Sequence, residues 1–268
     1  MRFLKKWAYY FWSVFEIIGG IRNWPAMLGL LLRRKDVSEH EVILRNPPVR
    51  LAIRGGMDLW AVKETFLDKF YTKYGVAVQE GWMVVDIGAG VGDFSILAAY
   101  SHPSVRVIAY EPFAGSFELL GKNIATNRIE NIFPFEQAVW SERGMVTLDQ
   151  STGEPLQISS NHVDEAEKSG GSRGVSAISL QDVLDKQTVE RIDLLKLDCE
   201  GAEYPILMGA SNETLAKVDR IIMEYHDLDE EHNHMTLSAA LLDAGYRVFC
   251  WENIVHEDIG YLFATREG

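Results

Sequence analysis

The sequence predicts an α/β protein whose sheet is mostly parallel and doubly wound, with an antiparallel strand pair near the C-terminus and a helical appendage at the N-terminus. Two observations carry this prediction. From residue 82 onward, short apolar runs alternate with segments of helical spacing, as expected for strands that helices cover on both faces. A glycine-rich turn follows the first apolar run and precedes a helix, which is the context of a ligand-binding turn.

The composition is that of an ordinary globular protein and excludes several classes. The chain has 268 residues, of which 47% are hydrophobic and 24% are charged, so it is neither disordered nor collagen-like. Its two cysteines favour a reducing, cytoplasmic compartment over a disulfide-stapled fold. The net charge of −13 argues against a nucleic-acid-binding surface, because phosphates attract the opposite charge.

Residues 1–40 predict a helical appendage, and residues 41–268 predict the main domain. Residues 1–50 carry nine Lys or Arg and four Asp or Glu, a net charge of +5, so the rest of the chain carries −18. The apolar face of the first helix consists of Leu4, Trp7, Ala8, Phe11, Phe15 and Ile18. No stretch here is uncharged for long enough to span a bilayer. Two interpretations stay open: the appendage packs on the main domain or on a second subunit of a homodimer, or residues 1–35 contact a membrane surface peripherally.

Apolar periodicity predicts the elements of the main domain. Buried strands are expected at residues 83–87, 106–110, 132–138, 193–197 and 220–224. Helices are expected at residues 58–74, 94–100, 116–125, 181–185 and 236–244. A hairpin is expected within residues 42–54 and an antiparallel pair at residues 247–251 and 259–264. Residues 150–174, rich in Ser, Gly, Glu and Asn, predict a flexible loop, which is either a surface insertion or a lid over the site.

The strongest local signal is the glycine-rich turn after the strand at 83–87. The residues expected to hold a ligand there are Asp86, Gly88, Ala89, Gly90 and Gly92. Glycines allow positive φ angles and let a ligand approach the backbone. The spacing is G-x-G-x-G, whereas a dinucleotide-binding turn reads G-x-G-x-x-G. Because Asp86 and Asp93 flank the turn, a ligand with positive charge and no phosphate fits better, and S-adenosylmethionine is such a ligand.

Two further residues are expected to complete this cofactor site. Glu111 ends the second strand, 23 residues after Gly88, where a carboxylate can accept hydrogen bonds from both ribose hydroxyls of an adenosine. Gln137 follows the third strand, where it would read the edge of the adenine ring. The alternative for Gln137 is an exposed turn residue without a role in binding.

Longer motifs identify a family. Together with the glycine turn, residues 193–203 (DLLKLDCEGAE) and residues 221–226 (IIMEYH) resemble the FkbM-type family of class I S-adenosylmethionine-dependent methyltransferases. The resemblance covers roughly residues 44–265 and includes the segment RGGMD at 54–58. It implies a Rossmann-like fold and methyl transfer to hydroxyl groups, often of sugars or of polyketide and glycolipid intermediates. Residues 1–40 and the loop at 150–174 lie outside the pattern.

The chemistry is expected at the carboxyl ends of the parallel strands, where such sheets bind ligands. The residues expected to converge there are Asp198, Glu200, Glu224 and His226. An alcohol needs a base as it attacks, and an ordinary histidine pKa suits His226 for that role. Asp198 would orient the hydroxyl or act as the base, beside the cofactor. Alternatively, the carboxylates hold a divalent cation, or Asp198 and Glu200 cap the following helix.

These patterns predict an S-adenosylmethionine-dependent O-methyltransferase that acts on a small hydroxylated molecule, and the family resemblance implies that this molecule contains a sugar. Two alternatives stay open at this point. The first is a nicotinamide-dependent oxidoreductase, which the glycine spacing and Asp93 disfavour. The second is a non-catalytic cofactor-binding module on the same fold, which the acidic residues on the fourth and fifth strands disfavour.

Overall fold

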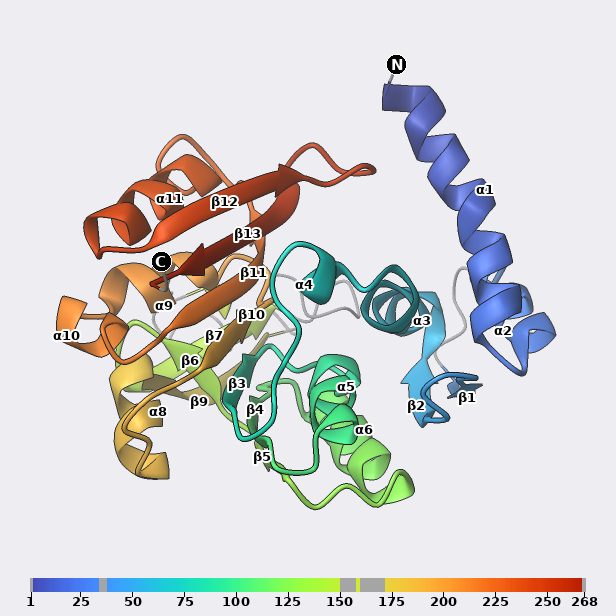
Figure 1. Cartoon of the computed structure of the whole chain (residues 1–268), viewed down its shortest axis with the longest axis horizontal. Helices are drawn as coiled ribbons and strands as arrows, with labels where there is room; N and C mark the ends of the chain where they lie inside the picture. Colours follow the sequence, from blue (N-terminus) through green and yellow to red (C-terminus); the bar gives the residue numbers. More distant parts are fainter. Residues whose placement is uncertain (1, 34–37, 150–157, 160–171, 267–268) are drawn as a thin grey trace.

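A computed structural model of the chain describes residues 2–33, 38–149, 158–159 and 172–266. Its centre is a seven-stranded sheet with the strand order β12-β13-β11-β10-β3-β4-β5 (Figure 1). The parallel strands are β3 (Met83–Ile87), β4 (Arg106–Tyr110), β5 (Ile132–Phe135), β10 (Leu194–Leu197) and β11 (Arg220–His226). The antiparallel pair consists of β12 (Arg247–Glu252) and β13 (Ile259–Thr265). The predicted α/β class and the closing strand pair are confirmed.

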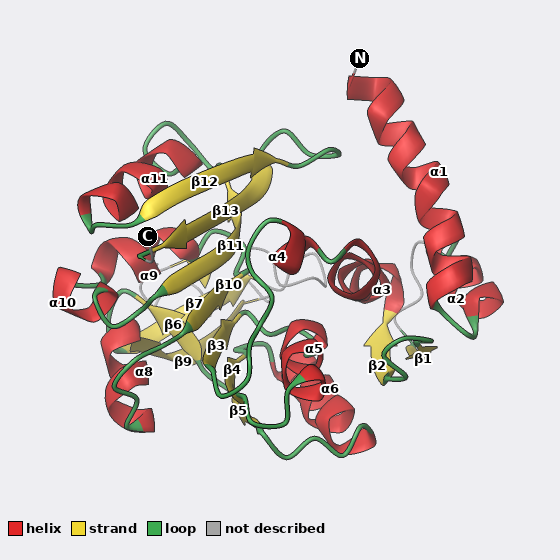
Figure 2. Cartoon of the chain, viewed as in Figure 1, coloured by secondary structure: helices red, strands yellow, loops and turns green. Residues whose placement is uncertain are grey.

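The sheet is covered on both faces, because its strands are apolar on both sides (Figure 2). One face packs against α5 (Asp93–Ser101), α6 (Ala114–Thr126) and the N-terminal elements. The other face packs against α8 (Leu180–Gln187), α9 (Glu203–Gly209) and α11 (His234–Asp243), with α10 (Asn212–Leu215) following α9. Side chains alternate between these layers, so that Val84 and Lys196 face the α5 side while Val85 and Leu195 face the α9 side.

A second, four-stranded sheet of order β6-β9-β7-β8 corrects two predictions. The strand predicted at 132–138 is two strands, because the chain leaves the main sheet after Phe135 and β6 (Ala138–Trp140) pairs with β9 (Ser172–Ser179) instead. The sequence analysis missed β7 (Gly144–Asp149). Within the predicted loop at 150–174, β8 (Ile158–Ser159) and the start of β9 are strands, and the remainder lies outside the described residues.

The N-terminal elements pack into the same apolar cluster as α5 and α6. They are α1 (Arg2–Gly20), α2 (Trp24–Leu31), the hairpin of β1 (Glu39–Ile43) and β2 (Arg50–Arg54), α3 (Gly55–Lys63), the π-helix η1 (Glu64–Asp68) and α4 (Phe70–Lys73). The hairpin is confirmed. The single helix predicted at 58–74 is divided by η1 and by Lys69, which has a φ of 57°.

The aromatic face predicted for α1 does not pack on the main domain. Trp7, Phe11 and Phe15 are exposed, whereas Ser13 and Ile17 on the opposite side are buried. The helix is held through its other face, so the appendage does pack on the main domain, as one of the two interpretations expected, but with its aromatic face turned away from it. No helix in the described ranges is long and apolar enough to cross a membrane.

Asn123 fastens the N-terminal hairpin to the main domain. Its fully buried side chain accepts a hydrogen bond from the Ala52 N–H and donates to the carbonyls of Ala52 and Val91, at 2.6, 3.0 and 2.8 Å. Asn127, one turn further along α6, bonds the backbone of Arg50 in the same way but lies at the surface. Asn123 and Asn127 thus make the same kind of amide hydrogen bonds to the backbone, Asn123 away from water and Asn127 in contact with it.

We expect Asn123→Ala to lower the free energy of unfolding by about 3 kcal/mol, because it leaves buried backbone groups without partners. Asn127→Ala is the matched control and should cost less than about 1 kcal/mol, since water replaces its hydrogen bonds. Denaturant unfolding of both variants measures the difference. Equal losses would show that the burial of Asn123 does not matter.

Candidate functional site

The glycine turn lies between β3 and α5, at the carboxyl edge of the main sheet. The N–H groups of Gly88 and Ala89 both donate to the Tyr110 carbonyl at 3.0 Å. A Cβ at Gly88 would lie 1.9 Å from the Asp198 carbonyl oxygen, so only glycine allows the turn to approach β10. At Gly90, by contrast, an added Cβ would meet open space. Gly92 begins α5 at a φ of 88°.

A buried ion pair supports this turn from below. The Lys196 Nζ lies 3.0 Å from the Asp86 Oδ1 and donates a 2.8 Å hydrogen bond to the Gly88 carbonyl. The other Asp86 oxygen accepts from the Ser95 hydroxyl at 2.6 Å. Burial lowers the pKa of Lys196, but the charge of Asp86 and other nearby carboxylates outweighs this and raises it. The lysine therefore keeps its charge and holds the turn against β3 and β10.

The expectation that Asp86 and Asp93 present free charge to a ligand needs correction. Asp86 has no exposed surface and is committed to Lys196 and Ser95. Asp93 is also buried and accepts a short hydrogen bond from the Thr65 hydroxyl. Asp86 thus positions the turn, and any effect it has on a cofactor passes through that turn.

Glu111 follows β4 and reaches back to the turn. Its carboxylate accepts hydrogen bonds from the N–H groups of Gly90 at 2.7 Å and Phe113 at 2.8 Å. Burial raises its pKa, and although these two hydrogen bonds oppose the rise, the pKa is about 7. Because a carboxylate has about four acceptor positions, Glu111 can accept further hydrogen bonds from a ligand at Gly90.

Gln137 lies in the connection from β5 to β6. In the sheet, β5 is separated by β4 from β3, the strand that the glycine turn follows. The side-chain amide of Gln137 donates to the Ser176 hydroxyl of β9 at 3.1 Å. The residue is partly exposed, and this bond ties it to the second sheet. Its predicted role at the adenine stays a prediction.

Asp198 follows β10 directly and is the residue that connects the turn with the acidic rim of the sheet. Its carbonyl lies against Gly88, while its carboxylate accepts a 2.7 Å hydrogen bond from the Tyr71 hydroxyl and lies 3.8 Å from the Lys196 Nζ. Burial and the charge of Asp198 raise the pKa of Tyr71 well above its usual range, so the phenol remains a donor. The carboxylate is partly exposed.

His226, at the end of β11, lies among carboxylates. Its Nε2 is 3.3 Å from Glu200 and its Nδ1 is 3.5 Å from the buried Glu203. Burial by itself lowers the pKa of His226. The carboxylates of Glu203 and Glu200 outweigh burial and raise the pKa to about 10. His226 therefore carries a proton at neutral pH, and its predicted role as a base near neutral pH is corrected: the ring is a cationic donor.

Glu224 shares the sheet face of His226 and Asp198, as predicted. Burial, together with the charges of Asp198 and Glu64, raises its pKa well above the usual range, which favours the protonated carboxyl. The four residues predicted to converge, Asp198, Glu200, Glu224 and His226, thus lie together, and Glu203 fixes their loop by accepting from the N–H groups of Cys199 and Gly201.

Two residues of this site were missed from the sequence. Glu64, on η1, has a pKa raised to about 8 by burial and by the charge of Asp68. Tyr261, on β13 opposite Glu224, is buried, and its hydroxyl has no hydrogen-bond partner among the described residues. A polar residue inside an apolar helical run was the available signal for Glu64, whereas Tyr261 is an ordinary strand residue in sequence.

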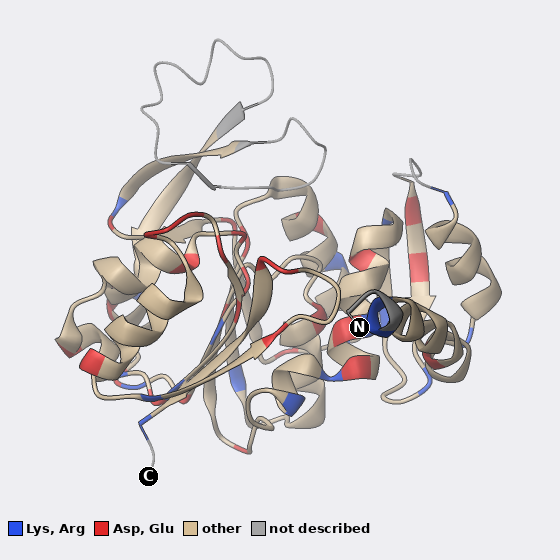
Figure 3. Ribbon diagram, turned by 90° about the horizontal axis from the view of Figure 1, so that it is seen from above, with Lys and Arg blue, Asp and Glu red and all other residues tan. Residues whose placement is uncertain are grey.

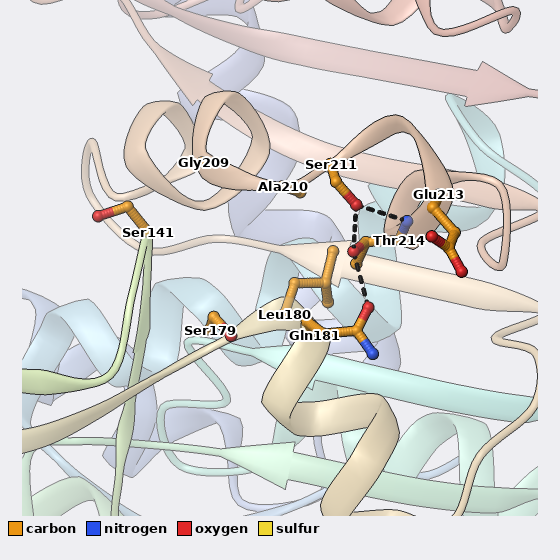
Figure 4. A pocket seen from close by; sticks show the side chains of 9 residues that line it. All are labelled: Ser141, Ser179, Leu180, Gln181, Gly209, Ala210, Ser211, Glu213 and Thr214. Atoms are coloured by element: carbon orange, nitrogen blue, oxygen red, sulfur yellow. Dashed lines mark hydrogen bonds between the residues drawn. The ribbon is translucent and has the colours of Figure 1, made fainter.

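A cavity of about 470 Å³ lies elsewhere, between the second sheet, α8 and the connection of α9 to α10 (Figure 4). Its polar lining is internally bonded, with Thr214 linked to both Ser211 and Gln181. It includes none of the predicted site residues. Within the described part of the chain, no three His, Cys, Asp or Glu side chains are arranged to hold a metal ion, so the geometry gives no support to a divalent cation.

The turn fits an adenosyl ligand better than a dinucleotide. The open side of Gly90 leaves room at the backbone, and Glu111 offers acceptors for ribose hydroxyls next to it. Lys196, the nearest cation beneath the turn, is already engaged by Asp86 and Gly88, so it is not available to a phosphate. The arrangement thus suits a ligand that carries hydroxyls and no phosphate.

Comparison with known proteins gives the family. A profile of the methyltransferase FkbM domain matches residues 86–248, more than half of the chain. The chain is 25% identical over 204 residues to the 31-O-demethyl-FK506 methyltransferase FkbM of Streptomyces tacrolimicus, covering 66% of this chain and 78% of that one. It is 20% identical over 215 residues to the hexuronic acid methyltransferase AglP of Haloferax volcanii, covering 80% and 84%. A 26% identical match to the AMB antimetabolite synthetase AmbE of Pseudomonas aeruginosa covers 63% of this chain but spans only 9% of that protein.

A solved structure agrees with the fold. A methyltransferase FkbM from Methylobacillus flagellatus superposes with a TM-score of 0.50 at 15% identity, covering 91% of this chain and 59% of that one. The family match overturns the alternatives of a nicotinamide-dependent oxidoreductase and a non-catalytic module. The chain has the Rossmann-like fold of class I methyltransferases and belongs to the FkbM family of S-adenosylmethionine-dependent methyltransferases.

Proposed function

We propose that this enzyme methylates a hydroxyl oxygen of a small, sugar-type molecule. The observation that carries the proposal is the position of Asp198, whose backbone touches the glycine turn while its carboxylate belongs to the acidic rim. Donor and acceptor sites would therefore adjoin at one residue. A sugar-type acceptor is supported by the relative named as a hexuronic acid methyltransferase and by the many polar groups on the rim.

For the donor, we assign Gly88, Ala89, Gly90 and Gly92 to the backbone cradle and Glu111 to the ribose hydroxyls, with Gln137 near the adenine. S-adenosylmethionine supplies an electrophilic methyl group on a sulfonium. Asp86 acts indirectly: it does not contact the donor but pairs with Lys196, which holds the turn in place. Most of the catalytic effect of such a site comes from fixing the acceptor oxygen in line with the methyl carbon.

For the acceptor, we assign Asp198 as the residue that accepts the proton of the attacking hydroxyl. The Tyr71 hydroxyl and the Lys196 ammonium both approach the Oδ2 atom, which leaves Oδ1 for the acceptor. His226 as an imidazolium, and Glu224 as a neutral carboxylic acid, would donate hydrogen bonds to other acceptor oxygens. Glu200 would hold the His226 ring in place.

The proposed function is tested by incubating the enzyme with S-adenosylmethionine and a panel of glycosides, uronic acids and glycolipids. Products should gain one CH₂ in mass at a hydroxyl oxygen, which fragmentation by mass spectrometry locates. Amines and nucleic acids belong in the same panel as controls. Methylation confined to nitrogen, or to nucleic acid, would contradict the proposal.

Glu111 makes donor binding depend on pH. Ribose hydroxyls donate to its ionised form, and its pKa is about 7, so affinity for S-adenosylhomocysteine should rise as pH increases from 6 to 8. Glu111→Gln should weaken binding by about tenfold or more and remove this pH dependence. Calorimetry at both pH values measures it, with the exposed Glu118→Gln as the matched control. Unchanged affinity in Glu111→Gln would remove Glu111 from the donor site.

Asp198→Asn tests the proton acceptor. The amide keeps the shape and the hydrogen bond from Tyr71 but accepts a proton poorly, so kcat should fall by a factor on the order of 10² to 10⁴. S-adenosylhomocysteine affinity should change far less than kcat. Asp193→Asn, at the opposite end of β10, controls for a general loss of charge. A kcat that survives in Asp198→Asn would place the base elsewhere.

His226 should remain protonated well above neutral pH. We expect its ring resonances in an NMR titration to keep imidazolium shifts at pH 8 and to move only as pH approaches about 10, since the carboxylates of Glu200 and Glu203 favour the charged ring. Glu200→Gln removes one of them and should lower this pKa. The resonances of the exposed His232 serve as the internal comparison. A midpoint near that of an ordinary histidine would restore His226 as a candidate base.

A further inference from the structure

The apolar side of α1 is turned to solvent. Trp7, Phe11, Trp12 and Phe15 are 60%, 60%, 62% and 51% exposed, and Val14 is 38% exposed. Among them, the rings of Phe11, Trp12 and Phe15 contact one another at centroid distances of 5.1 to 6.0 Å, and Trp7 lies one turn before Phe11. Such a concentration of exposed aromatic area on one helix is a mark of an interaction surface. We call Trp7, Phe11, Trp12, Val14 and Phe15 the aromatic face.

The opposite side of α1 is fastened to the protein, which fixes the direction of the aromatic face. Lys63, fully buried, lies 3.0 Å from the Glu16 carboxylate and donates to the Tyr9 hydroxyl at 3.1 Å. Tyr9 in turn donates to Asp68 at 2.6 Å, and Ile17 is buried. The helix lies at the edge of the molecule (Figure 1), and near its N-terminal end the Lys6 ammonium donates to the Val255 carbonyl, in the connection from β12 to β13, at 3.5 Å. A partner therefore meets a preformed surface.

Charge indicates what kind of partner this is. Residues 1–35 contain seven Lys or Arg and one Asp or Glu, a net charge of +6, so the rest of the chain carries −19. Basic residues mark the N-terminal end of α1 (Figure 3), and among them Lys5 is exposed, whereas the Lys6 ammonium donates to the Val255 carbonyl. An anionic surface attracts this end and repels the acidic body, which selects one orientation.

We propose that the aromatic face of α1 docks on the surface of an anionic lipid bilayer. Trp and Phe side chains favour the boundary between headgroups and acyl chains, and neighbouring Lys and Arg contact anionic headgroups. The helix lies in the plane of the membrane, and its fastened side keeps the main domain above it. This inference is independent of the methyl acceptor, and it is tested without measuring activity.

The test is co-sedimentation of the full-length chain with phosphatidylcholine vesicles that contain or lack phosphatidylglycerol. Binding should require the anionic lipid. The triple variant Trp7→Ala, Phe11→Ala, Phe15→Ala keeps helix-forming residues and should lose about tenfold or more in partitioning. Lys5→Glu should weaken binding to anionic vesicles by about tenfold. The matched control is Phe133→Ala, Phe249→Ala, which removes exposed aromatic rings outside α1 and should bind as the unmodified chain does.

Thermal unfolding of each variant confirms that the fold is intact, and sedimentation velocity gives the oligomeric state. Binding that needs both the anionic lipid and the aromatic face supports the proposal. No binding, equal binding to neutral vesicles, or unchanged binding of the triple variant overturns it. A dimer that the triple variant dissociates, without vesicle binding, also overturns it, because the aromatic face would then be an interface between two copies of the chain.

Discussion

The site depends on one buried cation. Lys196 comes from the middle of the sheet, pairs with Asp86 on the neighbouring strand and bonds the carbonyl of Gly88 in the turn. Burying such a pair costs desolvation energy, which good geometry and further hydrogen bonds offset. Ser95 supplies one of these bonds to Asp86. Removing either charge would leave the other buried without compensation. The shape of the turn and the charges around it therefore depend on the same ion pair.

The titratable side chains near Lys196 have different surroundings, and these surroundings decide which of them accept and which donate hydrogen bonds. Asp198 lies near the Lys196 ammonium and accepts from Tyr71, and it remains partly exposed. Glu224 lies close to other carboxylates, and its raised pKa favours the protonated carboxyl. His226 has carboxylates on both ring nitrogens and keeps its proton as well. Three titratable groups on one sheet face thus offer an acceptor, a neutral donor and a cationic donor, which is the mixture that a hydroxylated ligand requires.

The N-terminal elements contribute residues to the candidate site and also hold α1 in place. Their hairpin and helices share the core with α5 and α6, and η1 places Glu64 close enough for its charge to act on Glu224. Tyr71, which bonds Asp198, comes from α4. The same segment holds α1 through Lys63. The elements that precede the profile match at residues 86–248 are therefore built into the rim of the candidate site, while α1 carries the aromatic face on their far side.

The sequence by itself determined the α/β class, the bounds of β3 and β4, the hairpin, the closing strand pair and the grouping of Asp198, Glu200, Glu224 and His226, because these follow from apolar periodicity and from residues adjacent in the chain. Tertiary structure decided the rest. It buried Asp86 against Lys196, raised the pKa of His226 and brought Glu64 and Tyr261 to the rim. It also turned the aromatic face of α1 outward. A pKa and a burial depend on neighbours that are distant in the chain, and periodicity carries no information about them.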